Sequence, residues 1–280
     1  MGTSIVGIDA ATSPKKVGLA RGEITGDVVR VVEAMLGSEV DSVVETIASW
    51  AVGNRVLLAV DAPLGWPRAL GRGLHGHRAG QRLPGVAQDL FRRTTDRFVH
   101  EQLGKLPLEV GADRIARTAH AALGLLHDVR TRLGAPVPLV WTPGFEGVAA
   151  IEVYPAATLL SRRAPATGYK GREAAAQDSR QTILSALRDD WTLRVDRDLL
   201  ASSDDRLDAA VCVLAGADFI RGQSLAPDST QREAAEFEGW IWSRAHLKTS
   251  SRGLPRRLDG ENLGSSRPSA PSAWRRDGIA

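Results

Sequence analysis

The most informative stretch of this chain is Ser4-Ile5-Val6-Gly7-Ile8-Asp9, an apolar run that ends in a carboxylate. A second run of the same kind, Val56-Leu57-Leu58-Ala59-Val60-Asp61, follows later. Runs that are apolar at nearly every position are typical of parallel strands covered on both faces. In open α/β sheets, ligands bind outside the carboxyl ends of such strands. The two runs therefore predict an α/β domain with Asp9 and Asp61 at the edge of the sheet where a ligand would bind.

A further acidic signal is Asp205-Arg-Leu-Asp208, which opens an apolar stretch expected to be helical. Residues three apart share one face of a helix, so the two side chains would project together. Carboxylates in a first turn also stabilise the helix dipole, and simple capping is the alternative. If this helix starts at the two strand ends, the carboxylates repel one another unless Mg²⁺ or Mn²⁺ binds them. We expect the metal ligands to be Asp9, Asp61, Asp205 and Asp208.

Around Asp9 the sequence predicts the start of a mixed sheet. Strands are expected at residues 4–10, 17–20, 28–36 and 56–61, with a turn at Pro14. Ser38 is the expected N-cap of a helix over residues 39–52, because Asp41 stands where a capping box places its acidic residue. Hairpin-like strands, a helix and a parallel strand together indicate an α/β fold flanked by helices.

Residues 62–133 break this pattern. They begin with a segment rich in Pro and Gly and continue with helical patches at residues 86–103 and 113–133. Five of the six histidines of the chain lie here. We expect a mostly helical insertion or lid after the fourth strand, and not a second core.

The second half of the chain returns to an α/β pattern. Strands are expected at residues 138–142 and 148–153, and helices at 155–160, 172–187 and 205–219. Ser202 or Ser203 is the expected cap of the last helix, and a short element is expected at 237–243. One domain over residues 1–243 follows from these elements. From residue 244 the chain is rich in Ser, Arg, Gly and Pro, so residues 244–280 are expected to be a basic, disordered tail.

Composition excludes several classes of protein. The single cysteine, Cys212, allows no disulfide framework within the chain and supplies too few thiols for a structural zinc site. The beginning of the chain lacks the features of a secretory signal, and no apolar run approaches the length of a membrane span. We therefore expect a cytoplasmic protein with no membrane partner.

The charge distribution favours a polyanionic partner. Residues 66–132 hold 12 Lys/Arg and 6 Asp/Glu, and residues 244–280 hold 8 and 3. Basic segments on both sides of an acidic metal site suit a nucleic acid, although two solvated Arg-rich surfaces are the alternative. Lys15, Lys16 and Lys170 are expected to contact phosphates, for which a lysine serves as a point charge. Ordinary exposure of these lysines is the other interpretation.

Two further residues have both a functional and a structural interpretation. Glu152 ends the strand at residues 148–153, where it is either a catalytic carboxylate of the same site or one half of a buried ion pair. Arg93 is expected to contact nucleic acid, but Asp96 lies three residues further along a predicted helix. A local ion pair between the two is the alternative.

Taken together, these motifs resemble the domain of unknown function 429 family, regarded as predicted nucleases with a ribonuclease H-like fold. The motifs that carry the resemblance, between about Gly7 and Trp242, are Gly7-Ile-Asp9-Ala, Asp61-Ala-Pro-Leu-Gly-Trp-Pro67, Arg93-Thr-Thr-Asp96, Glu152-Val-Tyr-Pro155-Ala, Tyr169-Lys170, Asp205-Arg-Leu-Asp208-Ala and Glu238-Gly-Trp-Ile. A more distant similarity is to RuvC-type resolvases, which use a strand-1 Asp, an acidic strand-4 residue and a D-x-x-D pair on a late helix. The four aspartates match these roles, with Asp instead of Glu at the strand-4 position.

The resemblance implies a ribonuclease H-like mixed sheet and hydrolysis of phosphodiester bonds in DNA or RNA by two Mg²⁺ or Mn²⁺ ions. The catalytic residues would be Asp9, Asp61, Glu152, Asp205 and Asp208. Two alternatives remain at this point. One is a nucleic-acid-binding or scaffolding module without turnover. The other is an actin/hexokinase-like phosphotransferase, which shares the strand-and-hairpin start but normally has a second Asp-Gly hairpin that this sequence lacks.

Overall fold

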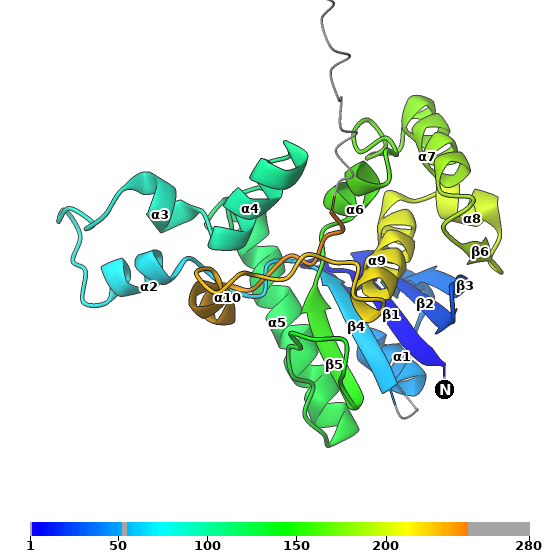
Figure 1. Ribbon diagram of the computed structural model, residues 1–280, viewed down its shortest axis with the longest axis horizontal. Coiled ribbons are helices and arrows are strands. Elements are labelled where there is room, and N and C mark those ends of the chain that lie inside the picture. The colour runs from blue at the N-terminus through cyan, green and yellow to red at the C-terminus, as the bar shows by residue number, and fades with distance from the viewer. Residues whose placement is uncertain (1, 52–54, 246–280) are drawn as a thin grey trace, which may run out of the picture. The chain divides into compact units, whose positions relative to one another are not determined.

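A computed structural model describes residues 2–51 and 55–245 of the 280-residue chain. Its centre is one mixed six-stranded sheet in the order β5-β4-β1-β2-β3-β6 (Figure 1). The strands are β1 (Thr3–Asp9), β2 (Gly18–Thr25), β3 (Val28–Leu36), β4 (Arg55–Asp61), β5 (Gly147–Glu152) and β6 (Thr192–Leu193). Only β2 runs against the others, because it is antiparallel to β1 and β3, while β4, β5 and β6 pair in parallel. The α/β prediction is confirmed.

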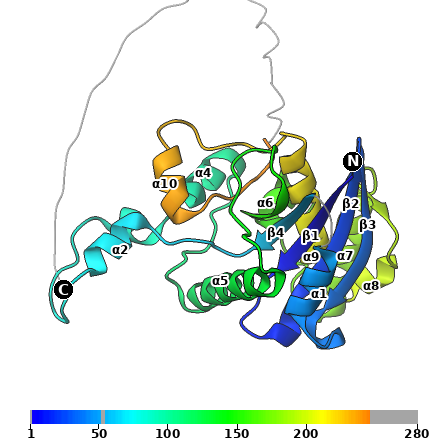
Figure 2. The same cartoon turned by 90° about the horizontal axis from the view of Figure 1, so that it is seen from below.

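Helices cover both faces of this sheet. The described helices are α1 (Val43–Trp50), α2 (Arg68–Leu74), α3 (Ala87–Phe91), α4 (Thr94–Leu103), α5 (Asp113–Leu133), α6 (Pro155–Ser161), α7 (Ala174–Ala186), α8 (Arg197–Ala201), α9 (Asp204–Ile220) and α10 (Arg232–Glu238), with 3-10 turns η1 (Pro14–Lys16) and η2 (Gly37–Glu39). Helix α9 packs on β1 and β2 and is buried almost along its whole length. Helices α1 and α5 lie side by side over the other face (Figure 2).

Two glycines let α9 approach the sheet closely. A Cβ atom on Gly7 of β1 would lie 2.0 Å from the Ala209 carbonyl oxygen, and one on Gly18 of β2 would lie 2.1 Å from that of Asp205. No side chain fits at either distance, so the backbone of the first turns of α9 rests directly on these strands. The start of α9 is thereby fixed beside the carboxyl end of β1.

Most of the predicted elements are present, and the predictions that were wrong have local causes. Strand β3 and helix α5 have the predicted bounds, and Ser203 caps α9 by accepting a hydrogen bond from the Arg206 amide. The predicted cap of α1 was wrong: Ser42 is the cap, because Glu45 follows it three residues later and donates its amide to Ser42 Oγ. The predicted strand at 138–142 was wrong as well, since only Leu139 forms an isolated bridge there.

The region 62–133 is mostly helical, as predicted, but it is not entirely a lid. Helix α5 contributes Ala122, Leu126 and Val129 to the core on the α1 face of the sheet. This helix is therefore part of the layered domain. Elements β6, α2 and α8 were not predicted from the sequence, and α10 overlaps the expected element at 237–243 only at its last two residues.

The predicted basic tail begins at residue 244, and residues 246–280 of it lie outside the described residues. Within the part of the chain that the structure describes, none of the helices has the length and apolar character needed to span a membrane.

Candidate metal centre

Asp9 and Asp61 are neighbours at the carboxyl ends of two adjacent parallel strands. They are register partners in the β1–β4 ladder, so their side chains leave the sheet on the same face. This is the face that α9 covers, because Gly7, two residues before Asp9, contacts that helix. The first turns of α9 bring Asp208 to the same point. Carboxylate oxygens of Asp9, Asp61 and Asp208 lie within 4.8 Å of one another.

Burial and mutual repulsion oppose ionisation of this cluster. Asp208 is fully buried, and the other two aspartates are mostly buried. Burial, followed by the charges of Asp208 and Asp61, raises the pKa of Asp9 well above its usual range. Burial and the charge of Asp208 raise the pKa of Asp61 to about 8. Without a bound cation, the cluster therefore retains protons near neutral pH.

Two side chains from the loop before α7 also contact the carboxylate of Asp208. The Tyr169 hydroxyl donates to Asp208 Oδ1 at 3.0 Å, and the Lys170 ammonium forms an ion pair with Oδ2. Burial lowers the pKa of Lys170, but the charges of Asp208 and Asp9 outweigh this effect and raise it, so the lysine remains charged. The lysine side chain is 54% exposed. In this structure Lys170 thus contributes its charge to the carboxylate cluster, although a phosphate contact was predicted for it.

A buried arginine holds this loop in place. Arg180 Nη1 donates to the carbonyl oxygens of Tyr169 at 2.6 Å and Gly171 at 2.9 Å, and its Nε donates to Ala201 at 2.6 Å. Neither Tyr169 nor Arg180 was predicted as a site residue. For Arg180 the sequence held a signal, because it falls between Ala176 and Ile183 on the buried stripe of α7. For Tyr169 the signal was the Tyr169-Lys170 motif of the family resemblance, but its contact with Asp208 could not be predicted, since 39 residues separate the two.

Asp205 borders the cluster without joining its three carboxylates. It lies in the first turn of α9 and is half-buried. Burial raises its pKa, and the charge of Asp204 adds to this, while Lys170 and Lys16 oppose it. The exposed Lys16 is therefore near enough to act on the acidic region, which is in line with a role at its rim.

Glu152 does not reach the cluster. It pairs in register with Val60, so its side chain leaves the sheet on the face opposite to that of Asp61. There it forms a buried ion pair with Arg93, at 2.8 Å between Oε1 and Nη2, and accepts a hydrogen bond from the Leu64 amide at 3.0 Å. Burial raises the pKa of Glu152, and the Arg93 guanidinium opposes this rise. The structure thus favours the ion-pair interpretation of Glu152 over a catalytic carboxylate.

For Arg93 as well, the structure favours the ion-pair interpretation over a contact with phosphates. Its side chain is 2% exposed and binds Asp96 through both Nε and Nη2. A further bond from Nη1 reaches the Glu238 carbonyl oxygen at 3.1 Å. With its donors directed at buried acceptors, Arg93 joins α4, the end of β5 and α10. The side chain of Glu238 completes the link by accepting the amides of Arg68 and Thr94.

This network leads to a prediction about stability. We expect Glu152→Ala to lower the free energy of unfolding by about 1–3 kcal/mol, because it removes one of the two carboxylates that pair with the buried Arg93 guanidinium and leaves the Leu64 amide without its acceptor. The measurement is urea unfolding of the metal-free protein. Glu45→Ala is the matched control, since Glu45 also pairs with an arginine, Arg132, but at the surface. Equal, small losses in both variants would contradict the structural role of Glu152.

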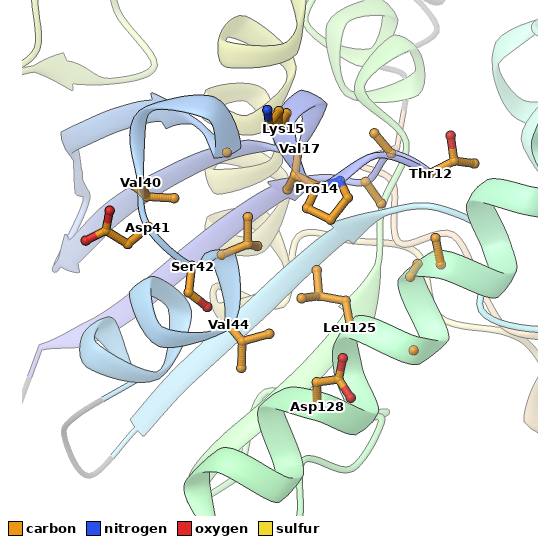
Figure 3. Close-up of a pocket in the computed structure, with 17 residues that line it drawn as sticks. Thr12, Pro14, Lys15, Val17, Val40, Asp41, Ser42, Val44, Leu125 and Asp128 are labelled. Carbon is orange, nitrogen blue, oxygen red and sulfur yellow. The ribbon is translucent and has the colours of Figure 1, made fainter.

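Cavities adjoin the loop that follows Asp9, and two of them matter for the site. One, of about 260 Å³, has Asp9 and Asp61 in its wall. The other, of about 490 Å³, lies between η1, the start of α1 and α5 (Figure 3). Lys15 lines this second cavity, together with Asp41 and Asp128. Lys15 is exposed, and its predicted phosphate contact stays a prediction.

Comparison with known proteins gives a family but no curated relative. A family model described as "Protein of unknown function (DUF429)" matches residues 7–232, which include all the carboxylates described above except Glu238. A search of curated proteins found no match.

Proposed function

The chain belongs to the DUF429 family of proteins of unknown function, and we propose that it is a divalent-metal-dependent nuclease with a ribonuclease H-like fold. The observation that carries the proposal is the convergence of Asp9, Asp61 and Asp208 within 4.8 Å at the carboxyl ends of β1 and β4. Carboxylates on a first strand, a fourth strand and a late helix are also the pattern implied by the resemblance to RuvC-type resolvases.

The charge of this cluster fits a hard divalent cation. When ionised, its three carboxylates carry three negative charges, and Lys170 is the cation that pairs with them among the described residues. Two negative charges remain in a buried place, where isolated charge is costly. Carboxylate oxygens suit Mg²⁺ and Mn²⁺, so either ion would relieve the repulsion that otherwise keeps protons on the cluster.

The chain's own residues would prepare the site for a phosphodiester. Asp9, Asp61 and Asp208 would hold the ion, and Asp205 would join them in a two-ion arrangement. When bound, the ions supply Lewis acids that polarise the phosphodiester and lower the pKa of the attacking water. Tyr169 fixes the orientation of Asp208 through its hydroxyl. Because Lys170 is half-exposed, its ammonium can turn from Asp208 to a phosphate oxygen.

The proposed substrate is a nucleic acid, either DNA or RNA. The charge of the exposed Lys16 acts on Asp205, and the basic stretch at residues 66–132 includes the helices that follow β4. Positive side chains beside a metal site position the phosphate backbone without reading its sequence. Binding should therefore weaken as salt concentration rises.

The test is a cleavage panel of single-stranded, duplex, hybrid and branched substrates, each with Mg²⁺, Mn²⁺ or EDTA. We expect cleavage of at least one substrate with a divalent ion and none with EDTA, because Lys170 offsets only one of the three negative charges and supplies no Lewis acid. Cleavage that persists in EDTA would contradict the proposal.

One observation favours a second candidate. The ion pair between Lys170 and Asp208 already neutralises part of the cluster, as expected of a site that binds no metal. The candidate is a nucleic-acid-binding or scaffolding module without turnover. In the same panel it predicts binding that is insensitive to EDTA and no cleavage under any condition.

A further inference from the structure

The smaller cavity lies directly against the carboxylate cluster. Its volume is about 260 Å³, and Asp9 and Asp61 are among the residues that line it. Pockets for drug-sized ligands enclose roughly 300–1,000 Å³, so this one suits a single compact group and not a length of strand. A group held here would be beside any phosphate bound at the aspartates.

The remaining walls are mainly apolar. The loop between α4 and α5 supplies Pro107 and Leu108, α5 supplies Ile115, and the segment after α10 supplies Ile241. Tyr154, just before α6, adds an aromatic ring that is partly exposed. Apolar and aromatic walls favour a flat, neutral ring over a second phosphate.

The polar groups in the cavity suit hydrogen bonds with a neutral partner. Arg93 and Glu152 line it, but their charges are paired with each other. Thr118 on α5 adds a hydroxyl that is half-exposed. Burial raises the pKa of Tyr154 to about 12, so its hydroxyl remains a donor at neutral pH. A few donors and acceptors among apolar walls match the edge and faces of a nucleobase.

We propose that this cavity receives the base of the nucleotide whose phosphate lies at Asp9, Asp61 and Asp208. The inference rests on the proposed function and narrows its substrate class. A base inside a duplex is stacked and paired and cannot enter a separate cavity, so the substrate is single-stranded or carries an unstacked nucleotide. The larger cavity in Figure 3 is not used for this role, because none of the three aspartates lines it, whereas Asp9 and Asp61 line the smaller one.

The test compares two chromogenic phosphodiesters in Mn²⁺: thymidine 5′-(p-nitrophenyl) phosphate, which has a base, and methyl p-nitrophenyl phosphate, which has none. Thr118→Trp fills the cavity, and Thr131→Trp is its matched control, since Thr131 is exposed on the same helix and does not line the cavity. We expect Thr118→Trp to raise KM for the thymidine ester by about 10-fold or more. The KM of Thr118→Trp for the methyl ester should match that of the wild type. The KM values of Thr131→Trp for both esters should match as well.

The outcomes separate the cavity from the nuclease proposal. Equal effects of Thr118→Trp on the two esters, or no effect, would overturn the base pocket and leave the nuclease intact. If the wild type hydrolyses neither ester, the nuclease proposal loses support. Equilibrium dialysis with thymidine 5′-monophosphate then tests separately whether the cavity binds a base. Binding by the wild type and Thr131→Trp, but not Thr118→Trp, supports the pocket; no binding by the wild type overturns it. Should Thr118→Trp fail to fold, Leu108→Asp replaces it, since Leu108 lines the cavity and is 68% exposed. The same weakening of thymidine ester or nucleotide binding is expected.

Discussion

Asp9→Asn is expected to abolish cleavage while leaving the fold intact. Asparagine keeps the size of the side chain but removes one negative charge from a cluster whose oxygens lie within 4.8 Å of one another. Loss of groups that merely support a metal ligand costs about 10–100-fold in affinity or activity, so loss of a ligand should cost more than about 100-fold. Nucleic-acid binding should persist, because basic residues outside the cluster supply it.

The same substitution should raise the melting temperature of the metal-free protein. Burial and the charges of Asp208 and Asp61 raise the pKa of Asp9, so at neutral pH folding requires this group to take up a proton or to hold a charge beside two other carboxylates, and an asparagine requires neither. The control is Asp189→Asn, which removes an 87% exposed carboxylate and should change neither property. Equal cleavage by wild type and Asp9→Asn, purified identically, would place the activity at another site or in a contaminant.

The stability of the metal-free protein should fall as pH rises from about 4 to about 8. The folded-state pKa values of Asp9, Asp61 and Asp208 are raised, with that of Asp61 at about 8, mainly because burial opposes ionisation. A raised pKa means that the folded state holds protons that the unfolded chain releases. The resulting stabilisation is complete below the unfolded pKa near 4 and is lost as pH passes through the folded values.

Divalent ions should reverse this loss. Carboxylates bind metal only when deprotonated, so the stabilisation by Mg²⁺ should be small at about pH 5 and large at about pH 8. Thermal melts across this range, with Mg²⁺ or with EDTA, measure both effects. In Asp61→Asn the decline of the metal-free protein should flatten, because one of the groups that binds the extra protons is gone. A melting temperature that is independent of pH and of Mg²⁺ would contradict the account.

The three converging aspartates could be predicted because each ends or begins a regular element. Asp9 and Asp61 close apolar strands that must lie side by side in a parallel pair, and their register then fixes the contact. The place of Asp208 needed one more condition, the close approach of α9 to Gly7. The periodicity of strands and helices indicates which residues share a face and where an element ends, and these three positions depend mainly on that.

The residues whose roles the sequence left open between two interpretations depend on contacts between distant segments. Glu152 also ends a strand, but it is in register with Val60, so alternation directs its side chain to the face opposite to that of Asp61. Arg93 resembles a surface arginine until Glu152 and Glu238, from far along the chain, enclose it. The ion pair between Lys170 and Asp208 likewise joins a loop to a helix start. Local sequence does not encode which of these distant residues contact one another.

The most direct test of the metal centre is anomalous diffraction at the manganese edge from crystals grown with Mn²⁺. The account predicts a peak at coordination distance, about 2.0–2.6 Å for hard divalent cations, from carboxylate oxygens of Asp9, Asp61 and Asp208. Lys170 should then have moved away from Asp208. No peak at these aspartates at saturating Mn²⁺, with Lys170 still paired to Asp208, would contradict the central claim.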